Sequence, residues 1–146
     1  MNPRLLILLL VGGAAQAATP AGPTAAPGRA QVPGATFATV LPPAPEQKSV
    51  TVAAFELDRS PVSNADYARF VSAHPEWRRD RVARVFADAG YLRHWPDGNG
   101  PAAANAAQPV TQVSWFAAKA YCEAQNARLP TWYEWELVGA DRKSVV

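Results

Sequence analysis

Cysteine is almost absent from this 146-residue chain, in which Cys122 is the only one. A single thiol excludes a disulfide within the sequence as given. In an exported protein, an odd cysteine indicates a free thiol or a partner outside these residues. A disulfide framework is therefore excluded as the source of this fold's stability.

Histidine is also scarce, with only His74 and His94 in the sequence. They are far apart in the chain, and neither has a cysteine or histidine partner at the close spacing of zinc sites. We therefore predict no metal site on either of them. No other residue pattern in the chain predicts a catalytic or cofactor-binding residue.

An excess of charge of one sign is missing too, because 14 basic residues face 12 acidic ones, for a net charge of +2. Recognition of phosphates needs a basic face, so the balance argues against nucleic acid or an anionic membrane as the main partner. Arg78, Arg79, Arg81 and Arg84 form the local exception. We interpret them as a solvated helix face, the usual meaning of a charge run.

The apolar run from Leu5 to Val11 is too short to cross a bilayer, which takes about 20 residues. It follows Arg4 and precedes a small-x-small site at Ala15 to Ala17, so residues 1–17 are predicted to be a signal peptide. A retained membrane anchor is the alternative interpretation. We expect an exported protein, periplasmic or secreted, with no stable membrane span after cleavage.

Residues 18–48 contain seven prolines among Ala, Gly and Thr, and few large apolar residues precede Phe37. Such a segment buries too little surface to offset its chain entropy. We predict a disordered, partly extended tether, with the folded part beginning near Ser49.

The first elements expected after the tether are a strand and a helix. Residues 49–58 carry apolar residues on both faces and few charges, which predicts a strand covered on both sides. Ser63 and Asp66 form a capping box that opens a helix ending near Ala73, before His74-Pro75. The helix stripe predicted to face the core consists of Tyr67, Phe70 and Val71.

Further along, a short helix is expected from Glu76 to Ala87, with Val82, Val85 and Phe86 inward and the arginines outward. A loop follows from residue 97, and residues 109–113 are extended. Ser114 is predicted to cap a helix that Asn126 closes in the left-handed conformation. Thr131 and Glu134 form a capping box for the last helix. Strands and helices without strict alternation predict an α+β fold.

Three segments resemble the formylglycine-generating, or sulfatase-modifying factor, family. They are FELDRSPVSNADYARF at 55–70, QPVTQVSWFAAKAYC at 108–122 and ARLPTWYEWE at 127–136. The resemblance covers residues 49–140, about the first half of the family's domain. Asn126 stands where the family usually has glycine, and Trp132-Tyr133 replace smaller residues, but neither change disturbs the capping pattern.

The resemblance implies a fold related to C-type lectins, poor in regular structure and often steadied by calcium. The family's oxidases convert a cysteine of a sulfatase to formylglycine, using oxygen and copper. The copper is held by a pair of cysteines late in the domain, as suits soft thiolates and monovalent copper. Those positions lie beyond this chain, so the resemblance assigns no catalytic, cofactor-binding or metal residue here, and we expect this piece alone to be inactive.

Individual residues near the motifs have competing interpretations. Cys122 is expected to be buried or disulfide-forming, as a cysteine there is in several relatives, rather than a nucleophile. Glu134 is a capping residue, and Glu136 is either a surface carboxylate or a partner for Arg128. The five tryptophans are predicted to be core residues and groove walls: Trp77, Trp95, Trp115, Trp132 and Trp135.

The last six residues, DRKSVV at 141–146, do not continue the pattern of the final helix. They resemble the translation of a common sequencing adapter, which predicts a non-native tail. An ordinary frayed terminus is the alternative.

Two functions remain open at this point. In the first, the parent protein is an exported oxidoreductase or maturation enzyme of the cysteine-to-formylglycine type, acting on a protein or peptide substrate such as a sulfatase. In the second, it is a non-catalytic, lectin-like binding or assembly module of the cell envelope, with the proline-rich tether as a spacer.

Overall fold

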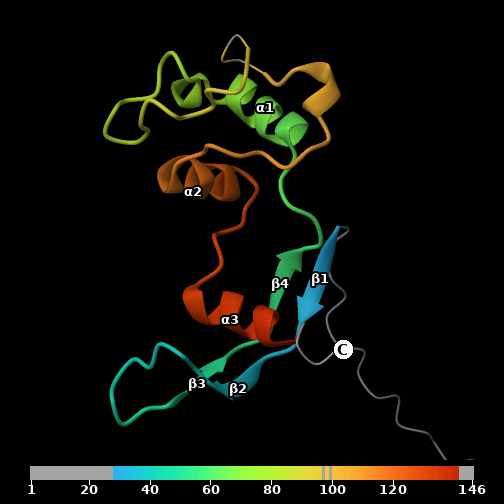
Figure 1. The fold of residues 1–146 in the computed structure, drawn as a ribbon. Coiled ribbons are helices and arrows are strands. Elements are labelled where there is room, and N and C mark those ends of the chain that lie inside the picture. Colours follow the sequence, from blue (N-terminus) through green and yellow to red (C-terminus); the bar gives the residue numbers. More distant parts are fainter. Residues whose placement is uncertain (1–27, 97, 99, 142–146) are drawn as a thin grey trace, which may run out of the picture.

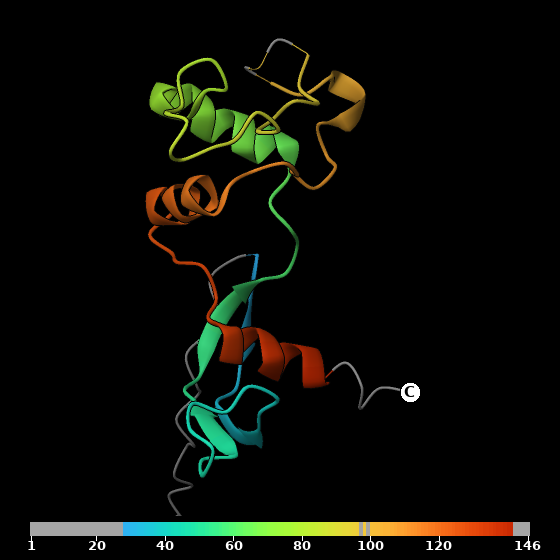
Figure 2. The ribbon, with the colours of Figure 1, turned by 60° about the vertical axis from the view of Figure 1, so that its left-hand side comes forward.

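The computed structural model describes residues 28–96, 98 and 100–141. These residues form two antiparallel strand pairs and three α-helices, so the predicted α+β class is confirmed. The helices are α1 (Asn64–Ala73), α2 (Trp115–Ala124) and α3 (Trp132–Asp141). In Figures 1 and 2, α1 and α2 lie together in one part, whereas the strands and α3 lie in the other. The predicted signal peptide lies outside the described residues.

The prediction of a disordered tether over residues 18–48 is wrong for residues 29–32 and 35–38, which form strands. β1 (Arg29–Val32) pairs with β4 (Phe55–Asp58), and β2 (Ala35–Ala38) pairs with β3 (Ser49–Val52). A strand pair is held by backbone hydrogen bonds and by cross-strand side-chain pairs, so it can form with few large apolar residues. Thr36 and Thr51 supply such a pair, with their hydroxyls 2.8 Å apart. Among the described residues, folded structure is therefore already present at β1, and residues 18–27 lie outside the described part.

The single strand predicted over residues 49–58 is divided between the two pairs, and residues 53 and 54 separate β3 from β4. Gly34 passes this break so closely that a Cβ there would meet the backbone N of Ala54 at 2.7 Å. Val50 and Val52 are buried, whereas Thr51 is exposed, so β3 is covered on one face only. The expectation of two covered faces is wrong, because the second face has no layer above it among the described residues.

Helix α1 is formed as predicted. Ser63 accepts from the Asp66 N–H, and the Asp66 carboxylate accepts from the Ser63 N–H, which completes the capping box. The helix ends at Ala73, since the residue before Pro75 avoids helical angles. Its stripe forms the core together with residues from the following segment and α2: Tyr67, Phe70, Val71, Tyr91, Leu92, Trp95 and Ala117.

The helix predicted from Glu76 to Ala87 is not present. A single 3-10 turn, Pro75–Trp77, is followed by irregular turns, and Val85 is 75% exposed. Arg79 also departs from the predicted solvated face, since its Nη1 donates to three backbone carbonyls, long-range contacts that a local sequence pattern does not reveal. The acceptors are the oxygens of Leu92, Arg93 and Trp95, at 3.1, 3.3 and 3.0 Å.

Helix α2 begins and ends as predicted. The Ser114 hydroxyl accepts from the Ala117 N–H at 3.1 Å, and Asn126 follows the helix with a φ of 52°. Before it, residues 100–113 form a loop with a short 3-10 turn at Ala103–Asn105 and a bridge between Pro109 and Ser63.

Helix α3 packs against β3, and Figure 2 shows it beside the strands. Its N-terminus carries the predicted Thr131 and Glu134 box. Within the residues that the structure describes, no helix has the length and apolar character needed to cross a membrane.

Candidate functional site

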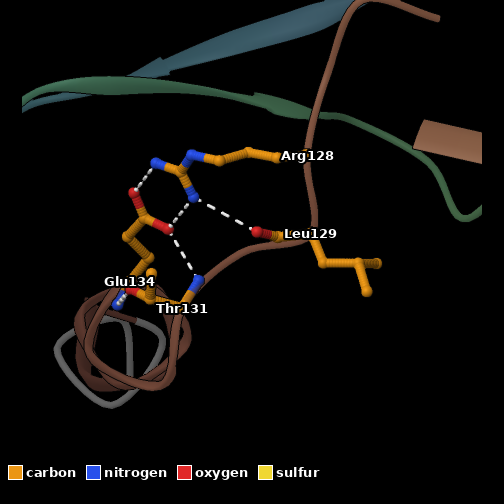
Figure 3. A network of polar contacts seen from close by, with 4 residues as sticks. All are labelled: Arg128, Leu129, Thr131 and Glu134. Carbon is orange, nitrogen blue, oxygen red and sulfur yellow. Dashed lines mark hydrogen bonds and ion pairs between the residues drawn. The ribbon is translucent and has the colours of Figure 1, made fainter. Parts of the chain in front are cut away.

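A bidentate ion pair joins the connection after α2 to the start of α3. Figure 3 shows Arg128 and Glu134 facing each other, with Nη1 to Oε2 at 2.7 Å and Nη2 to Oε1 at 2.5 Å. The Thr131 N–H also donates to Glu134 Oε2 at 2.7 Å. This bidentate pair orients α3 relative to the connection.

The hydrogen bonds from Arg128, followed by those from Thr131, lower the pKa of Glu134 to about 2. The carboxylate is therefore ionised at neutral pH, and its oxygens are engaged by donors. Glu134 has no proton to give and serves as an anchor, in agreement with its prediction as a capping residue.

Glu136 does not pair with Arg128, so that alternative is wrong. Its carboxylate turns to the other end of the chain, where Thr39 Oγ1 donates at 2.6 Å and the Val40 N–H at 2.7 Å. The Thr39 hydrogen bond, together with that from Val40, lowers the pKa of Glu136. Both terminal guanidinium nitrogens of Arg128 are already bound to Glu134.

A buried polar cluster holds α1 to the loop before α2. Asn64 is 2% exposed, and its Nδ2 donates to the carbonyls of Asn105, Gln108 and Pro109 at 3.1, 3.2 and 3.4 Å. The indole N–H of Trp95, which is fully buried, donates to Asn64 Oδ1 at 3.0 Å. The sequence analysis did not predict Asn64 as a hub. An asparagine inside the first turn of a capped helix could have indicated it, because such a side-chain amide can hydrogen-bond to backbone groups.

Two buried tyrosines continue this cluster. The hydroxyls of Tyr67 and Tyr91 lie 3.0 Å apart, and Tyr91 donates to the Trp77 carbonyl at 2.9 Å. Burial raises the pKa of both phenols. Both are therefore protonated at neutral pH and act as hydrogen-bonding groups rather than as bases.

Cys122 lies on α2 with a partly buried, free thiol. Burial, and then the charge of Asp58, raise the pKa of this thiol. Because the thiolate is the reactive form, a raised pKa favours the packing interpretation over the nucleophile.

The two histidines have ordinary structural surroundings. The His74 ring packs on Phe70, with centroids 4.9 Å apart, and lies 3.6 Å from Glu76. His94 Nδ1 is 3.1 Å from Gln112 Oε1. Within the described part of the chain, no group of three or more His, Cys, Asp or Glu side chains is arranged to hold a metal ion.

The copper implied by the family resemblance does not fit the described residues. A pair of thiolates is required, and Cys122 is one thiol with a raised pKa. Calcium prefers several oxygen ligands, but the carbonyls that converge at Leu92, Arg93 and Trp95 are taken by the Arg79 guanidinium. We therefore assign no metal-binding residue.

The tryptophans separate into two groups. Trp95 is in the core, as predicted, and Trp77 is partly buried against it. Trp115, Trp132 and Trp135 are 62%, 56% and 56% exposed, so they are not core residues, and their assignment as groove walls stays a prediction. More than half of each of these side chains remains uncovered, which the spacing of residues in a sequence does not reveal.

An aromatic row crosses the surface beside α2. It runs from Trp77 through Phe86 and Phe116 to Trp115, with successive ring centroids 6.1, 5.4 and 5.4 Å apart. Phe86 and Phe116 are 43% and 45% exposed. Next to the row, a hollow of about 210 Å³ lies between Asp88–Tyr91 and Gln112–Ser114. This is the described surface most suited to contact with another molecule.

A second hollow, of about 330 Å³, opens between the C-terminal halves of α1 and α2. Arg69, which is ion-paired with Asp66, lies on one side, and Tyr121 and Gln125 lie on the other. Its polar groups are partnered or at the surface, so it lacks the converging buried polar groups of a specific site.

These features define an α+β domain in which two serine-capped helices meet over an Asn64–Trp95 hub and a third helix opens on an Arg128–Glu134 pair. The profile of the Sulfatase-modifying factor enzyme 1-like domain matches residues 10–143 of the chain. The protein therefore belongs to this family, which confirms the resemblance drawn from the three segments.

Two curated relatives carry the name hercynine oxygenase. The protein from Mycolicibacterium smegmatis is 32% identical over 99 residues, which are 60% of this chain and 23% of the relative. That from Mycolicibacterium thermoresistibile is 33% identical over 99 residues, which are 60% of this chain and 22% of the relative. The chain thus aligns with less than a quarter of the length of these relatives.

Proposed function

We propose that this chain is the N-terminal part of an exported oxidoreductase of the sulfatase-modifying factor family. The main support is the family match over residues 10–143, together with two relatives named as oxygenases. The substrate that we propose is a cysteine-containing protein or peptide, such as a sulfatase, which is oxidised to formylglycine. The described residues would serve as the scaffold on which the catalytic part of the domain is placed.

The fragment status is supported by the surface of the molecule. The aromatic row exposes Trp115, Phe116 and Phe86, and an apolar patch of this kind is unusual on the surface of a complete domain. A further part of the domain that covers this row would account for it. We propose that the complete domain has the C-type-lectin-like fold and that the chain alone is inactive.

Export is proposed from the pattern of residues 1–17, in which a basic start, an apolar run and a small-x-small site follow one another. The test is to express the natural gene with a C-terminal tag and to sequence the N-terminus of the mature protein. A start at Ala18 in the periplasmic or secreted fraction supports export. An intact Met1 in the cytoplasm contradicts it.

The activity is tested on the protein encoded by the uninterrupted genomic reading frame that contains codons 1–140. The protein is incubated with copper, oxygen and either a cysteine-containing sulfatase peptide or hercynine. An aldehyde-reactive probe detects formylglycine, and an oxygen electrode detects turnover. Aldehyde formation on the peptide supports the proposed substrate.

Oxygen uptake with hercynine but not with the peptide would favour hercynine, the compound in the names of the two relatives, as the substrate. No turnover with either compound, in a reading frame without a late cysteine pair, would favour the non-catalytic binding module. The proline-rich segment supports such a spacer less than its composition suggests, since β1 and β2 pair with later strands and take eight of its residues.

A further inference from the structure

Two hydrogen bonds to one carboxylate join segments that are nearly a hundred residues apart. Thr39 Oγ1 donates to Glu136 Oε2 at 2.6 Å, and the Val40 N–H donates to Oε1 at 2.7 Å. Each oxygen of Glu136 thus holds one donor of the N-terminal segment. The contact lies where β2 leaves the sheet and the exposed loop toward β3 begins.

Neighbouring hydrogen bonds stabilise the same segment. The Thr39 N–H donates to the Lys48 carbonyl at 3.1 Å, which ties the two ends of the loop together. The Leu41 N–H donates to Thr39 Oγ1 at 3.1 Å, and Tyr133 donates to the Leu41 carbonyl at 3.2 Å. Helix α3 therefore holds residues 39–41 by side chains one turn apart, at positions 133 and 136.

The segment held in this way covers a strand edge. β2 supplies the partner of β3 along one edge, from Ala35 opposite Val52 to Ala38 opposite Ser49. Val50 and Val52 of β3 are buried, and α3 packs against this strand. If β2 separates, the edge of an apolar strand is left with unpaired backbone groups, which favours pairing with another chain.

We propose that residues 35–41 form a strap over the β3 edge and that the charge of Glu136 holds the strap closed. This inference does not depend on the proposed enzymatic function. An ionised carboxylate only accepts, which matches the two donors of the strap. A neutral carboxyl or amide group could still contact Thr39, whose hydroxyl can turn to accept, but both contacts would lose the assistance of the charge.

The charged groups on the adjoining elements do not replace Glu136. The loop after the strap carries Glu46 and Lys48, α3 carries Glu134 and Asp141 besides Glu136, and β3 carries none. Glu134 is engaged by Arg128 and Thr131. Among the described contacts of Glu136, the partners that lower its pKa are the hydroxyl of Thr39, the amide of Val40 and the side chain of Trp132.

The direction of the pH effect follows from this lowered pKa. A carboxyl group whose pKa is lower in the folded state contributes stability above its unfolded value, near 4.3. The contribution is lost as the pH falls through the folded value. The strap is therefore closed at neutral pH and opens in acid.

Hydrogen exchange by mass spectrometry on the whole chain tests the proposal. Protection factors are measured for peptides covering residues 35–41 at pH 7 and at about pH 2.5, well below the ordinary carboxyl pKa, with α1 as the internal reference. Glu136→Gln should increase strap exchange about tenfold at pH 7 through loss of a charge-assisted bond. Glu123→Gln, in an exposed pair with Lys119, is the matched control and should leave the strap unchanged.

The pH dependence of exchange distinguishes the effect of Glu136 from the effects of other carboxylates. The wild-type strap should lose protection as the pH falls below about 4.3 and through the lowered pKa of Glu136, whereas the Glu136→Gln variant should lose less protection over the same range. Thr39→Val removes one donor without a change in charge and should open the strap severalfold. Equal strap protection in wild type and Glu136→Gln at pH 7, or an unchanged pH dependence in the variant, would overturn the proposal.

Discussion

The indole N–H of Trp95 donates to the amide oxygen of Asn64 across 3.0 Å, and both side chains are almost completely shielded from solvent. The same amide group donates to three loop carbonyls through its nitrogen. Asn64 thus joins α1 to the turn at Trp95, from which its oxygen accepts, and to the loop before α2, to which its nitrogen donates. The packing of the helical part depends on this one side chain.

Replacing Asn64 by alanine should lower the free energy of unfolding by about 2 to 3 kcal/mol, because the Trp95 N–H and the loop carbonyls lose their partner in a buried site. Urea denaturation followed by tryptophan fluorescence measures the change. Gln125→Ala, at an exposed position of the α2 C-cap, is the control and should stay within about 0.5 kcal/mol of wild type. Similar stabilities of the two variants would contradict the role of Asn64.

The Glu134 carboxylate should make the N-terminus of α3 sensitive to acid. Its pKa is lowered to about 2, so its contribution is complete above the unfolded value near 4.3 and is lost as the pH falls toward 2. Arg128→Ala should raise this pKa toward the ordinary value, as seen by carboxyl NMR titration. Arg93→Ala, on an exposed turn, should leave it unchanged; an unaltered Glu134 titration in Arg128→Ala would disprove the assignment.

Arg79 should be needed for the turn that carries Leu92 and Trp95. Arg79→Met removes the donor to three carbonyls and should destabilise the turn by about 1 to 2 kcal/mol. Hydrogen exchange of residues 91–95 is the measurement. Arg84→Met, on an exposed side chain of the same segment, should have no effect on these amides. Equal exchange in both variants would show that Arg79 is dispensable.

The aromatic row should bind an apolar dye. Phe116→Ser should lower the fluorescence of a bound naphthalene sulfonate without a large loss of stability, since Phe116 is 45% exposed. Phe70→Ser, in the buried core, should instead lower the free energy of unfolding by about 3 kcal/mol and increase dye binding. Unchanged dye binding in Phe116→Ser would place the apolar surface elsewhere.

Cys122 should react slowly with a disulfide reagent. Its raised pKa reduces the thiolate fraction near neutral pH, so the rate should be severalfold below that of a cysteine peptide and should rise at higher pH. Asp58→Asn removes a charge that raises this pKa and should increase the rate. A rate for wild type equal to that of the free peptide would refute the packing interpretation.

Much of the local structure could be predicted from the sequence because its signals are local. The caps at Ser63, Ser114 and Thr131 involve residues three positions apart, and the stop at Ala73 depends on the next two residues. The α+β class and the family follow from the same short patterns. The failures lie where a distant partner decides, as at β1 and β2, which were expected to be disordered, and at the helix expected over residues 76–87.

The sequence by itself thus determined where helices α1, α2 and α3 begin, which stripe of α1 is apolar, and the family. The tertiary structure alone decided that Arg79 turns inward, that Asn64 is a hub, that Glu136 holds residues 39 and 40, and that three tryptophans stay exposed. Capping and helix stops are fixed by neighbours along the chain, whereas burial and long-range pairing depend on which surfaces meet after folding.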